Sequence, residues 1–390
     1  MGNSGFRKRD LVVPVFVPSI LFSAGEGAII PILPTAAQHL GASLPVAGFI
    51  AGLTMLGTVL FDVPAARLVR RFGERNAMLT SAFIAAAALL LALVSTNLWQ
   101  LGAAVLIAGA MISSFGLARH SYMAEQVPMN QRARALSLLG GMFRGGAFLG
   151  PMIGAAIVFQ FGINGVYLAG AVLCLSAGVV LLLTPKETAH REANLQQFTA
   201  FAIAKREWRK LATVGASASV LAIMRTVRQV GLPLWGIYIG MHPGTVSLFI
   251  GIAGFLDLLL FYTSGQIMDR WGRKWALIPT LVGMSVAHIL MIFVHDQTSF
   301  MLVAIAMSLA NALGSGIVLT IGADLAPADA RSEFLGAYRL LVDSGSAAAP
   351  VLLSLLTVTI TLPGAFLSFA GISLVGAWLG WRWLPKFGIK

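Results

Sequence analysis

The feature that most limits the fold of this chain is a series of apolar runs of about 20 residues, which fill most of its 390 residues. Because a helix rises about 1.5 Å per residue, such a run spans the roughly 30 Å hydrocarbon core of a bilayer. The runs therefore predict an all-α membrane protein. Twelve transmembrane helices are expected, six near 11–37, 44–67, 76–95, 98–121, 135–159 and 163–184, and six near 211–239, 244–266, 275–294, 298–322, 333–358 and 362–384.

The scarcity of charge supports this interpretation. Charged residues make up 11% of the chain, against about 25% in a soluble domain. So few charges could not cover a soluble globule, so lipid is the expected solvent for most of the surface. The first run follows Arg7-Lys8-Arg9 as a signal peptide would, but it continues through Pro31 and Pro34 without a small-residue cleavage site. We interpret it as a retained helix.

The net charge of +12 could indicate a nucleic-acid partner, but its distribution argues against one. Of the 27 Lys and Arg residues, 22 lie at the two termini, in every second gap between the runs, or in the polar stretch 185–210. The positive-inside rule then predicts a multi-pass protein of the inner membrane, with both termini and this stretch in the cytoplasm.

The two halves repeat at a constant offset of 199 residues. AEQVPMNQRARAL (124–136) matches ADLAPADARSEFL (323–335), and Pro151 matches Pro350. The repeat predicts an N-terminal six-helix bundle (1–184), a linker (185–210) that includes an amphipathic helix, and a C-terminal six-helix bundle (211–390). In transporters built from such repeats the substrate site lies near the membrane midplane, between the halves.

The segment GQIMDRWGRK (265–274) resembles the loop after the second helix of a half in the major facilitator superfamily, and the resemblance extends over essentially the whole chain. It implies a cytoplasmic gate, in which Asp269 pairs with a base or a helix terminus. The first-half copy, ARLVRRFGER (66–75), has Arg70 in place of the acid and Glu74 in place of a base. Either Glu74 substitutes there, or the second half carries the gate alone. The gate candidates are Gly265, Asp269, Arg270, Gly272, Arg273, Asp62, Glu125, Arg132, Asp324 and Arg331.

A second motif narrows the resemblance. GAFLGPMIG (146–154) is similar to the fifth-helix motif of the twelve-span drug:proton antiporters, although Ser137 and Ala155 stand where that motif has Gly. Its small residues permit close helix packing. The resemblance implies export of a small amphipathic compound, driven by the proton gradient without another cofactor. The motif positions are Gly146, Gly150, Pro151 and Gly154.

Charged residues inside the apolar runs are the best site candidates, because each costs about 2.5–3.5 kcal/mol at a helix centre. Glu26 in the first run and Asp257 in the eighth are the proton-coupling candidates. The repeat maps Glu26 onto Arg225, and the first and seventh helices of this fold face each other across the cavity. We therefore predict a Glu26–Arg225 pair, which either couples transport to protons or is a static salt bridge.

Arg225 and Arg228 lie one turn apart on a single helical face. Such a face suits an anionic or aromatic substrate, although each Arg could instead neutralise an acid on a neighbouring helix. Arg339 and Asp343 have i, i+4 spacing and could pair with each other. The substrate-binding candidates are Arg225, Arg228, Arg144, Asn311, Trp235, Tyr238, Arg339 and Asp343.

The sequence contains no phosphate-binding loop, no metal-ligand spacing and no nucleophile–base signature, and its one cysteine is Cys174. We expect neither an enzyme nor a metal or organic cofactor. The expected partners are a small-molecule substrate and membrane lipid, and the expected state is a monomer. An uptake symporter for an organic anion, a lipid or lysolipid flippase and a non-transporting sensor remain as alternatives.

Overall fold

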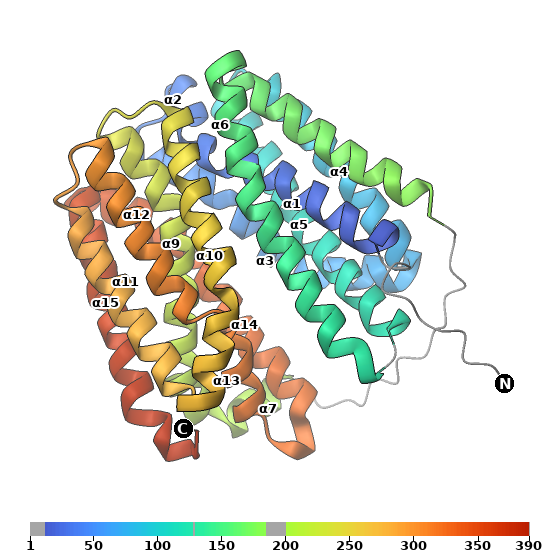
Figure 1. Cartoon of the computed structure of the whole chain (residues 1–390), viewed down its shortest axis with the longest axis vertical. Helices are drawn as coiled ribbons and strands as arrows, with labels where there is room; N and C mark the ends of the chain where they lie inside the picture. Colours follow the sequence, from blue (N-terminus) through green and yellow to red (C-terminus); the bar gives the residue numbers. More distant parts are fainter. Residues whose placement is uncertain (1–11, 128, 185–199, 390) are drawn as a thin grey trace. The chain divides into compact units, whose positions relative to one another are not determined.

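The computed structural model describes residues 12–127, 129–184 and 200–389, with the side chains left out at 12, 124–126, 129–137, 200, 201, 328 and 332. The described residues are almost entirely helical and contain no strand (Figure 1). They form two compact units. Unit 1 lies within Met1–Arg191 and Met241–Gly254, and unit 2 lies within Glu192–Gly240 and Phe255–Lys390.

Unit 1 contains the first six predicted spans. Its fifth and sixth spans are one continuous element, broken at Gly162, where φ is 70°. The first span is interrupted at Pro31, where the backbone tightens into a 3-10 turn. The elements are η2 (Val12–Phe16), α1 (Val17–Ile29), η3 (Ile30–Ile32), α2 (Leu33–His39), α3 (Leu44–Phe72), α4 (Glu74–Leu93), α5 (Leu98–Gln126) and α6 (Met129–Leu182).

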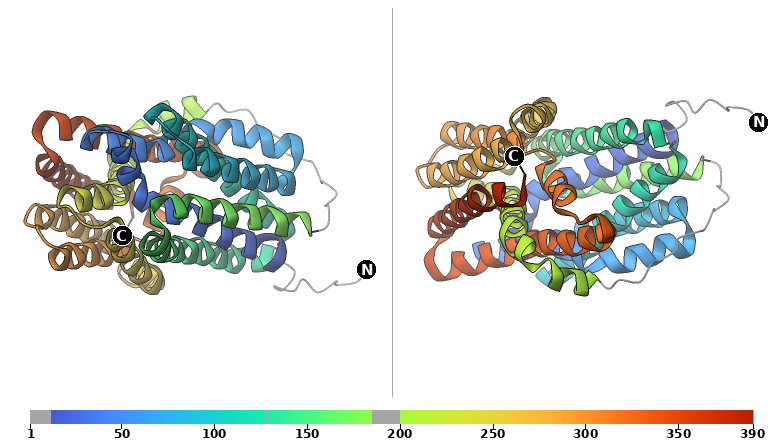
Figure 2. Two further views of the ribbon diagram at one scale, coloured as in Figure 1. Left: turned by 90° about the horizontal axis from the view of Figure 1, so that it is seen from above. Right: turned by 90° about the horizontal axis from the view of Figure 1, so that it is seen from below.

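Unit 2 contains the other spans, except that the first turns of α10, up to Gly254, belong to unit 1. In both end-on views of Figure 2, its helices lie side by side as a bundle. The elements are α7 (Ala200–Arg206), α8 (Trp208–Lys210), η4 (Leu211–Gly215), α9 (Ala216–Tyr238), α10 (Pro243–Trp271), α11 (Lys274–Met291), α12 (Gln297–Leu313), α13 (Ile317–Leu325), η5 (Ala328–Ala330), α14 (Arg331–Ile360), α15 (Leu362–Trp383) and η6 (Pro385–Phe387).

Eleven helices in the described part of the chain are long and apolar enough to cross a membrane. Because one of them, Leu138–Leu182, is divided at Gly162, the spans number twelve, as the sequence predicts. The repeat is visible in local geometry as well. Gly73 and Gly272, which are 199 residues apart, both have positive φ (81° and 96°) in the turn that follows the second helix of a half. Glycine adopts this conformation without the steric cost that a side chain would add.

The tenth predicted span, 298–322, is broken between α12 and α13, where Gly316 has φ 82°. The break frees backbone carbonyls inside the unit, and side chains from two other helices bind them. Ser264 Oγ of α10 donates to the carbonyls of Leu313 (2.7 Å) and Ser315 (2.8 Å). Arg225 Nη2 of α9 donates to the carbonyl of Gly314 (2.7 Å). These bonds compensate the break, because unsatisfied backbone groups are costly in a membrane.

Within the predicted linker, the short helix α7 packs on α14 of unit 2. Arg206 Nη1 forms an ion pair of 2.7 Å with Asp329 in η5. Both side chains are exposed, and the hydrogen bond from Arg206 holds the pKa of Asp329 below its ordinary value. This contact ties the end of the linker to the second unit.

Candidate functional site

Glu26 is placed by close packing of α1 on α6. A Cβ added at Gly25 would lie 2.9 Å from the carbonyl oxygen of Gly170. A Cβ added at Gly150 would lie 2.6 Å from the carbonyl oxygen of Ala24. The antiporter-motif glycines, Gly146, Gly150 and Gly154, thus all pack against the stretch of α1 that carries Glu26.

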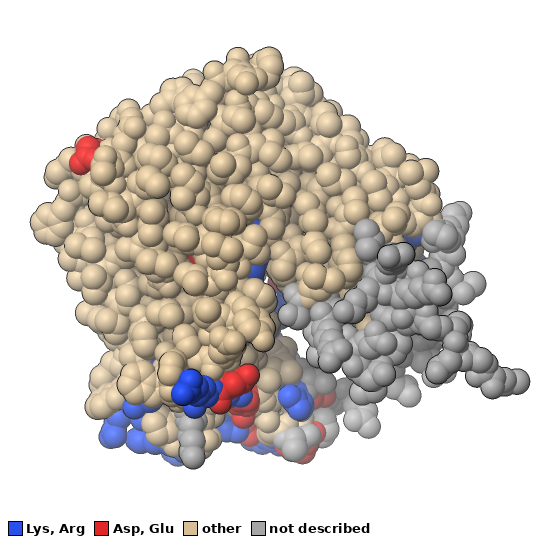
Figure 3. All heavy atoms as spheres, in the orientation of Figure 1, with Lys and Arg blue, Asp and Glu red and all other residues tan. Residues whose placement is uncertain are grey.

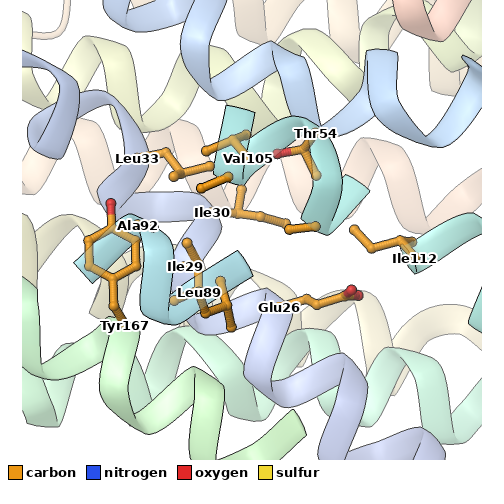
Figure 4. Close-up of a pocket in the computed structure, with 12 residues that line it drawn as sticks. Glu26, Ile29, Ile30, Leu33, Thr54, Leu89, Ala92, Val105, Ile112 and Tyr167 are labelled. Carbon is orange, nitrogen blue, oxygen red and sulfur yellow. The ribbon is translucent and has the colours of Figure 1, made fainter. Parts of the chain in front are cut away.

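The Glu26 side chain lines a small cavity inside unit 1 (Figure 4). The carboxylate points along the cavity toward Ile112. The cavity has a free volume of about 20 Å³, which is room for one or two water molecules. Apart from Glu26, Thr54 and Tyr167 the lining is apolar, with Ile29, Ile30, Leu33, Leu89, Ala92, Ala104, Val105, Ala108 and Ile112.

Several buried polar atoms of unit 1 have no hydrogen-bond partner among the described residues. They include Oε1 of Glu26, Nε of Arg119 and the hydroxyl of Tyr167. Arg119 in α5 is buried and interacts electrostatically with Glu26, while its guanidinium lies 5.4 Å from the centre of the Phe143 ring. Since buried polar groups are nearly always paired, such a concentration of unpaired ones requires an explanation.

Arg119 was missed as a partner of Glu26. It lies near the end of the predicted helix 98–121 and is not among the predicted site residues. The structure brings the two charges together through Phe22 and Phe115, whose rings stack with centroids 4.1 Å apart, and each charge follows one turn later on its helix. The sequence alone carries no signal for this contact.

In unit 2 the corresponding polar residues form a closed network. Arg228 donates to Asp257 (2.5 Å) and to Ser308 (2.9 Å). Asn311 Nδ2 donates to Asp257 (3.1 Å), and Asn311 Oδ1 accepts from Arg225 Nε (2.9 Å). The alternative in which an Arg neutralises an acid on a neighbouring helix is therefore confirmed for Arg228. The structure brings four predicted site residues of α9, α10 and α12 together.

The unit 1 cavity and the unit 2 network occupy the same place in the repeat. The offset of 199 residues relates Glu26 to Arg225, Ile29 to Arg228 and Ile112 to Asn311. One member of each pair lines the cavity, and the other belongs to the network. The predicted Glu26–Arg225 pair joins one residue of each unit and stays a prediction.

The other substrate-binding candidates are Trp235, Tyr238, Arg339, Asp343 and Arg144. Trp235 is 1% exposed and donates its indole N–H to the carbonyl of Val294 (3.2 Å), as a packing residue does. Tyr238 is half exposed near the end of α9. Arg339 and Asp343 form the predicted i, i+4 pair at 3.1 Å. Arg144 is half-buried in α6.

The gate candidates of unit 2 gather around Arg273. Its Nε donates to Asp324 (2.8 Å), and its Nη1 donates to the carbonyl of Met268 (3.0 Å) and lies 3.9 Å from Asp269. Asp324 thus bonds to Arg273, and the gate candidate Arg331 is exposed. Arg270, Gly272, Arg273 and Asp324 also line a second cavity, whereas a Cβ added at Gly265 would face open space.

The corresponding turn of unit 1 has neutral donors. Ser121 donates to Glu74 (3.0 Å), and Ser113 donates to Asp62 through a short hydrogen bond. Glu74 is therefore held by a hydroxyl where unit 2 has an ion pair. The side chains of Glu125 and Arg132 lie outside the described residues.

The twofold repeat of six spans, with a gate turn in each half, is the architecture of one large family of transporters. The family sequence model of the Major Facilitator Superfamily matches residues 15–228 and again residues 214–389. The chain belongs to the Major Facilitator Superfamily. As a member of that superfamily it is a multi-pass membrane transporter and not an enzyme.

Relatives in this superfamily include drug-resistance proteins. The chain is 24% identical over 383 residues to the class B tetracycline resistance protein of Escherichia coli, covering 94% of this chain and 90% of that protein. It is also 24% identical over 395 residues to the multidrug resistance protein MdtG of Citrobacter koseri, covering 97% and 96%.

Solved structures share the fold at low identity. A POT family transporter in complex with a thioalcohol-conjugated peptide aligns with a TM-score of 0.81 at 14% identity, over 97% of this chain and 96% of that one. A D-xylose–proton symporter aligns with a TM-score of 0.71 at 16% identity, over 97% and 98%. At these identities the likeness concerns the fold alone.

Proposed function

We propose that this transporter exports a small amphipathic, drug-like compound in exchange for protons, and that Glu26 carries the proton. The observation that supports the proposal is the Glu26 carboxylate, whose Oε1 is enclosed without a hydrogen-bond partner among the described residues. The drug-resistance relatives support the substrate class. Export, proton coupling and the place of the protein in the inner membrane belong to the proposal.

The surroundings of Glu26 suit a group that changes its protonation. An apolar environment favours the neutral form of a carboxyl group, and a nearby guanidinium favours the charged form. Glu26 has an apolar cavity on one side and interacts electrostatically with Arg119. A change in the access of water, or in the distance to Arg119, would then bind or release a proton. Asp257 is the second candidate, but it already accepts from Arg228 and Asn311.

Glycine packing explains how a proton-dependent change at Glu26 could be passed on. Because α1 touches α6 backbone to backbone at Gly150, a shift of the α1 turn that carries Glu26 must move α6 or break the contact. The antiporter motif therefore connects the proposed proton site mechanically to a second helix of the same unit.

The test uses proteoliposomes that enclose a pH-sensitive dye, without an imposed proton gradient. Tetracycline, a cationic dye and an organic anion are added outside in turn. Exchange expels protons as substrate enters, so we expect the lumenal pH to rise with at least one compound. Glu26→Gln should reduce the rise at least about tenfold, while Glu333→Gln, a carboxylate in the first turn of α14, should leave it unchanged.

Three outcomes would contradict the proposal. A fall in lumenal pH would indicate a symporter. Substrate entry without a pH change would indicate transport without proton coupling. An equal pH rise in wild type and Glu26→Gln would move the proton site elsewhere, with Asp257 next to be tested.

A further inference from the structure

Tryptophan is concentrated at one end of unit 2. Of the eight tryptophans in the chain, five lie where α10 ends, α11 begins and α15 ends. Four of them are more than half exposed. We call the five the tryptophan cluster: Trp271, Trp275, Trp378, Trp381 and Trp383.

Three cations lie on the rings of this cluster. The Arg270 guanidinium is 5.5 Å from the centre of the Trp271 ring, Lys274 Nζ is 5.4 Å from that of Trp381, and Lys386 Nζ is 4.0 Å from that of Trp383. None of the three forms an ion pair with a described carboxylate, whereas Arg273 nearby is paired with Asp324. Figure 3 shows Lys and Arg side chains gathered at the end of the unit where the C-terminus lies. These three positive charges therefore lie against aromatic faces and not in ion pairs with described carboxylates.

A cavity of about 520 Å³ adjoins the cluster. Arg270, Trp271 and Arg273 line one part of it together with the acids Asp269 and Asp324, and the C-terminal residues Phe387–Ile389 line another. A volume of this size can hold a small polar group.

The repeat indicates that the cluster is not required by the fold. The positions in unit 1 that correspond to the five tryptophans hold Phe72, Asn76, Val179, Leu182 and Thr184. Arg75, the counterpart of Lys274, donates to the carbonyl of Leu182 (3.0 Å) and to Thr184 (3.2 Å). Both halves thus place a base against the end of their sixth span, but only unit 2 adds tryptophans.

We infer that the tryptophan cluster, with Arg270, Lys274 and Lys386, is a binding site for the headgroup of an anionic phospholipid. Tryptophan favours the boundary between hydrocarbon and headgroups, and clustered Lys and Arg attract anionic lipid on the cytoplasmic side. The predicted orientation puts this end of unit 2 in the cytoplasm. The inference concerns lipid and holds whatever the transported substrate is.

The test measures lipid binding to the purified full chain by native mass spectrometry, with phosphatidylglycerol and phosphatidylcholine compared at equal concentration. Wild type should prefer phosphatidylglycerol. The triple variant Arg270→Gln/Lys274→Gln/Lys386→Gln should lose about fivefold in phosphatidylglycerol affinity for each charge removed. The matched control, Arg67→Gln/Arg70→Gln/Arg71→Gln, removes three charges from unit 1 and should keep the preference.

Thermal unfolding of both triple variants checks that they are folded, and Trp378→Leu/Trp381→Leu tests the rings while all charges remain. Equal losses in the two triple variants would reduce the effect to general electrostatics and overturn the inference. So would an unchanged preference in the unit 2 variant. Displacement of the lipid by millimolar inorganic phosphate would also overturn it, because the site would then be one for free phosphate.

Discussion

The two units use the same place in the repeat in opposite ways. In unit 2 the helix is broken at Gly314–Gly316, and Arg225 and Ser264 bind the carbonyls that the break frees. In unit 1 α5 runs through without a break. At the corresponding positions unit 1 has Phe115 and Leu117 in place of Gly314 and Gly316. It has Glu26 in place of Arg225 and Ala65 in place of Ser264.

This difference explains why Oε1 of Glu26 has no hydrogen-bond partner among the described residues. In unit 2 Arg225 donates to a carbonyl that the break frees. In unit 1 the corresponding helix is unbroken, and no described residue donates to Oε1 of Glu26. Unit 2 has closed its polar interior into a network, while unit 1 keeps a buried acid in an apolar cavity. Six of the seven buried polar atoms without a partner in the described chain belong to unit 1. Two halves of one fold thus differ in how far their buried polar atoms are hydrogen-bonded.

The largest effect should come from opening the unit 2 network. Asp257→Asn keeps the shape of the side chain but leaves the charge of Arg228 without its acid, and the two side chains are only 12% and 19% exposed. We expect a loss of about 3–5 kcal/mol in the free energy of unfolding. Thermal unfolding in detergent measures it, and Asp257→Leu/Arg228→Leu should recover much of the loss. A loss below about 1 kcal/mol would mean that the network is not structural.

An intermediate effect should come from the glycine contact that positions Glu26. In Gly150→Ala the added methyl group would lie 2.6 Å from the Ala24 carbonyl oxygen, so the helices must separate. We expect a loss of about 1–3 kcal/mol in stability. The matched control is Gly145→Ala in the same helix, where the methyl group would meet nothing within 4 Å. Equal stability of the two variants would contradict the close packing of α1 and α6.

The smallest effect on stability should come from Glu26→Gln, although it should abolish proton exchange. Since Oε1 has no hydrogen-bond partner among the described residues, replacing the carboxyl group with an amide should leave the unfolding free energy within about 0.5 kcal/mol of wild type, or raise it. The same unfolding assay decides the matter. A loss of more than about 1 kcal/mol in the unfolding free energy would favour a static Glu26–Arg225 salt bridge. It would also remove the contrast between the units.

Much of this fold is predictable from the sequence, because long apolar runs and the two left-handed turn glycines, Gly73 and Gly272, are local signals. The contact of Arg228 with Asp257 was among the predicted alternatives, since an embedded charge demands a partner. The break at Gly316 and the interaction of Arg119 with Glu26 were missed. Both depend on side chains from other helices, which hydropathy does not report. Comparing Gly314 and Gly316 with Phe115 and Leu117 would have revealed the first.

The broken helix also has a consequence for biogenesis. Its carbonyls cannot enter hydrocarbon until donors are available to them. Both donors, Arg225 in α9 and Ser264 in α10, precede Leu313–Ser315 in the chain. During synthesis from the N-terminus, the ribosome therefore delivers the donors before the acceptors. When the broken helix enters the bilayer, both donors are already present. Its free carbonyls therefore need not remain without hydrogen bonds at any stage of assembly.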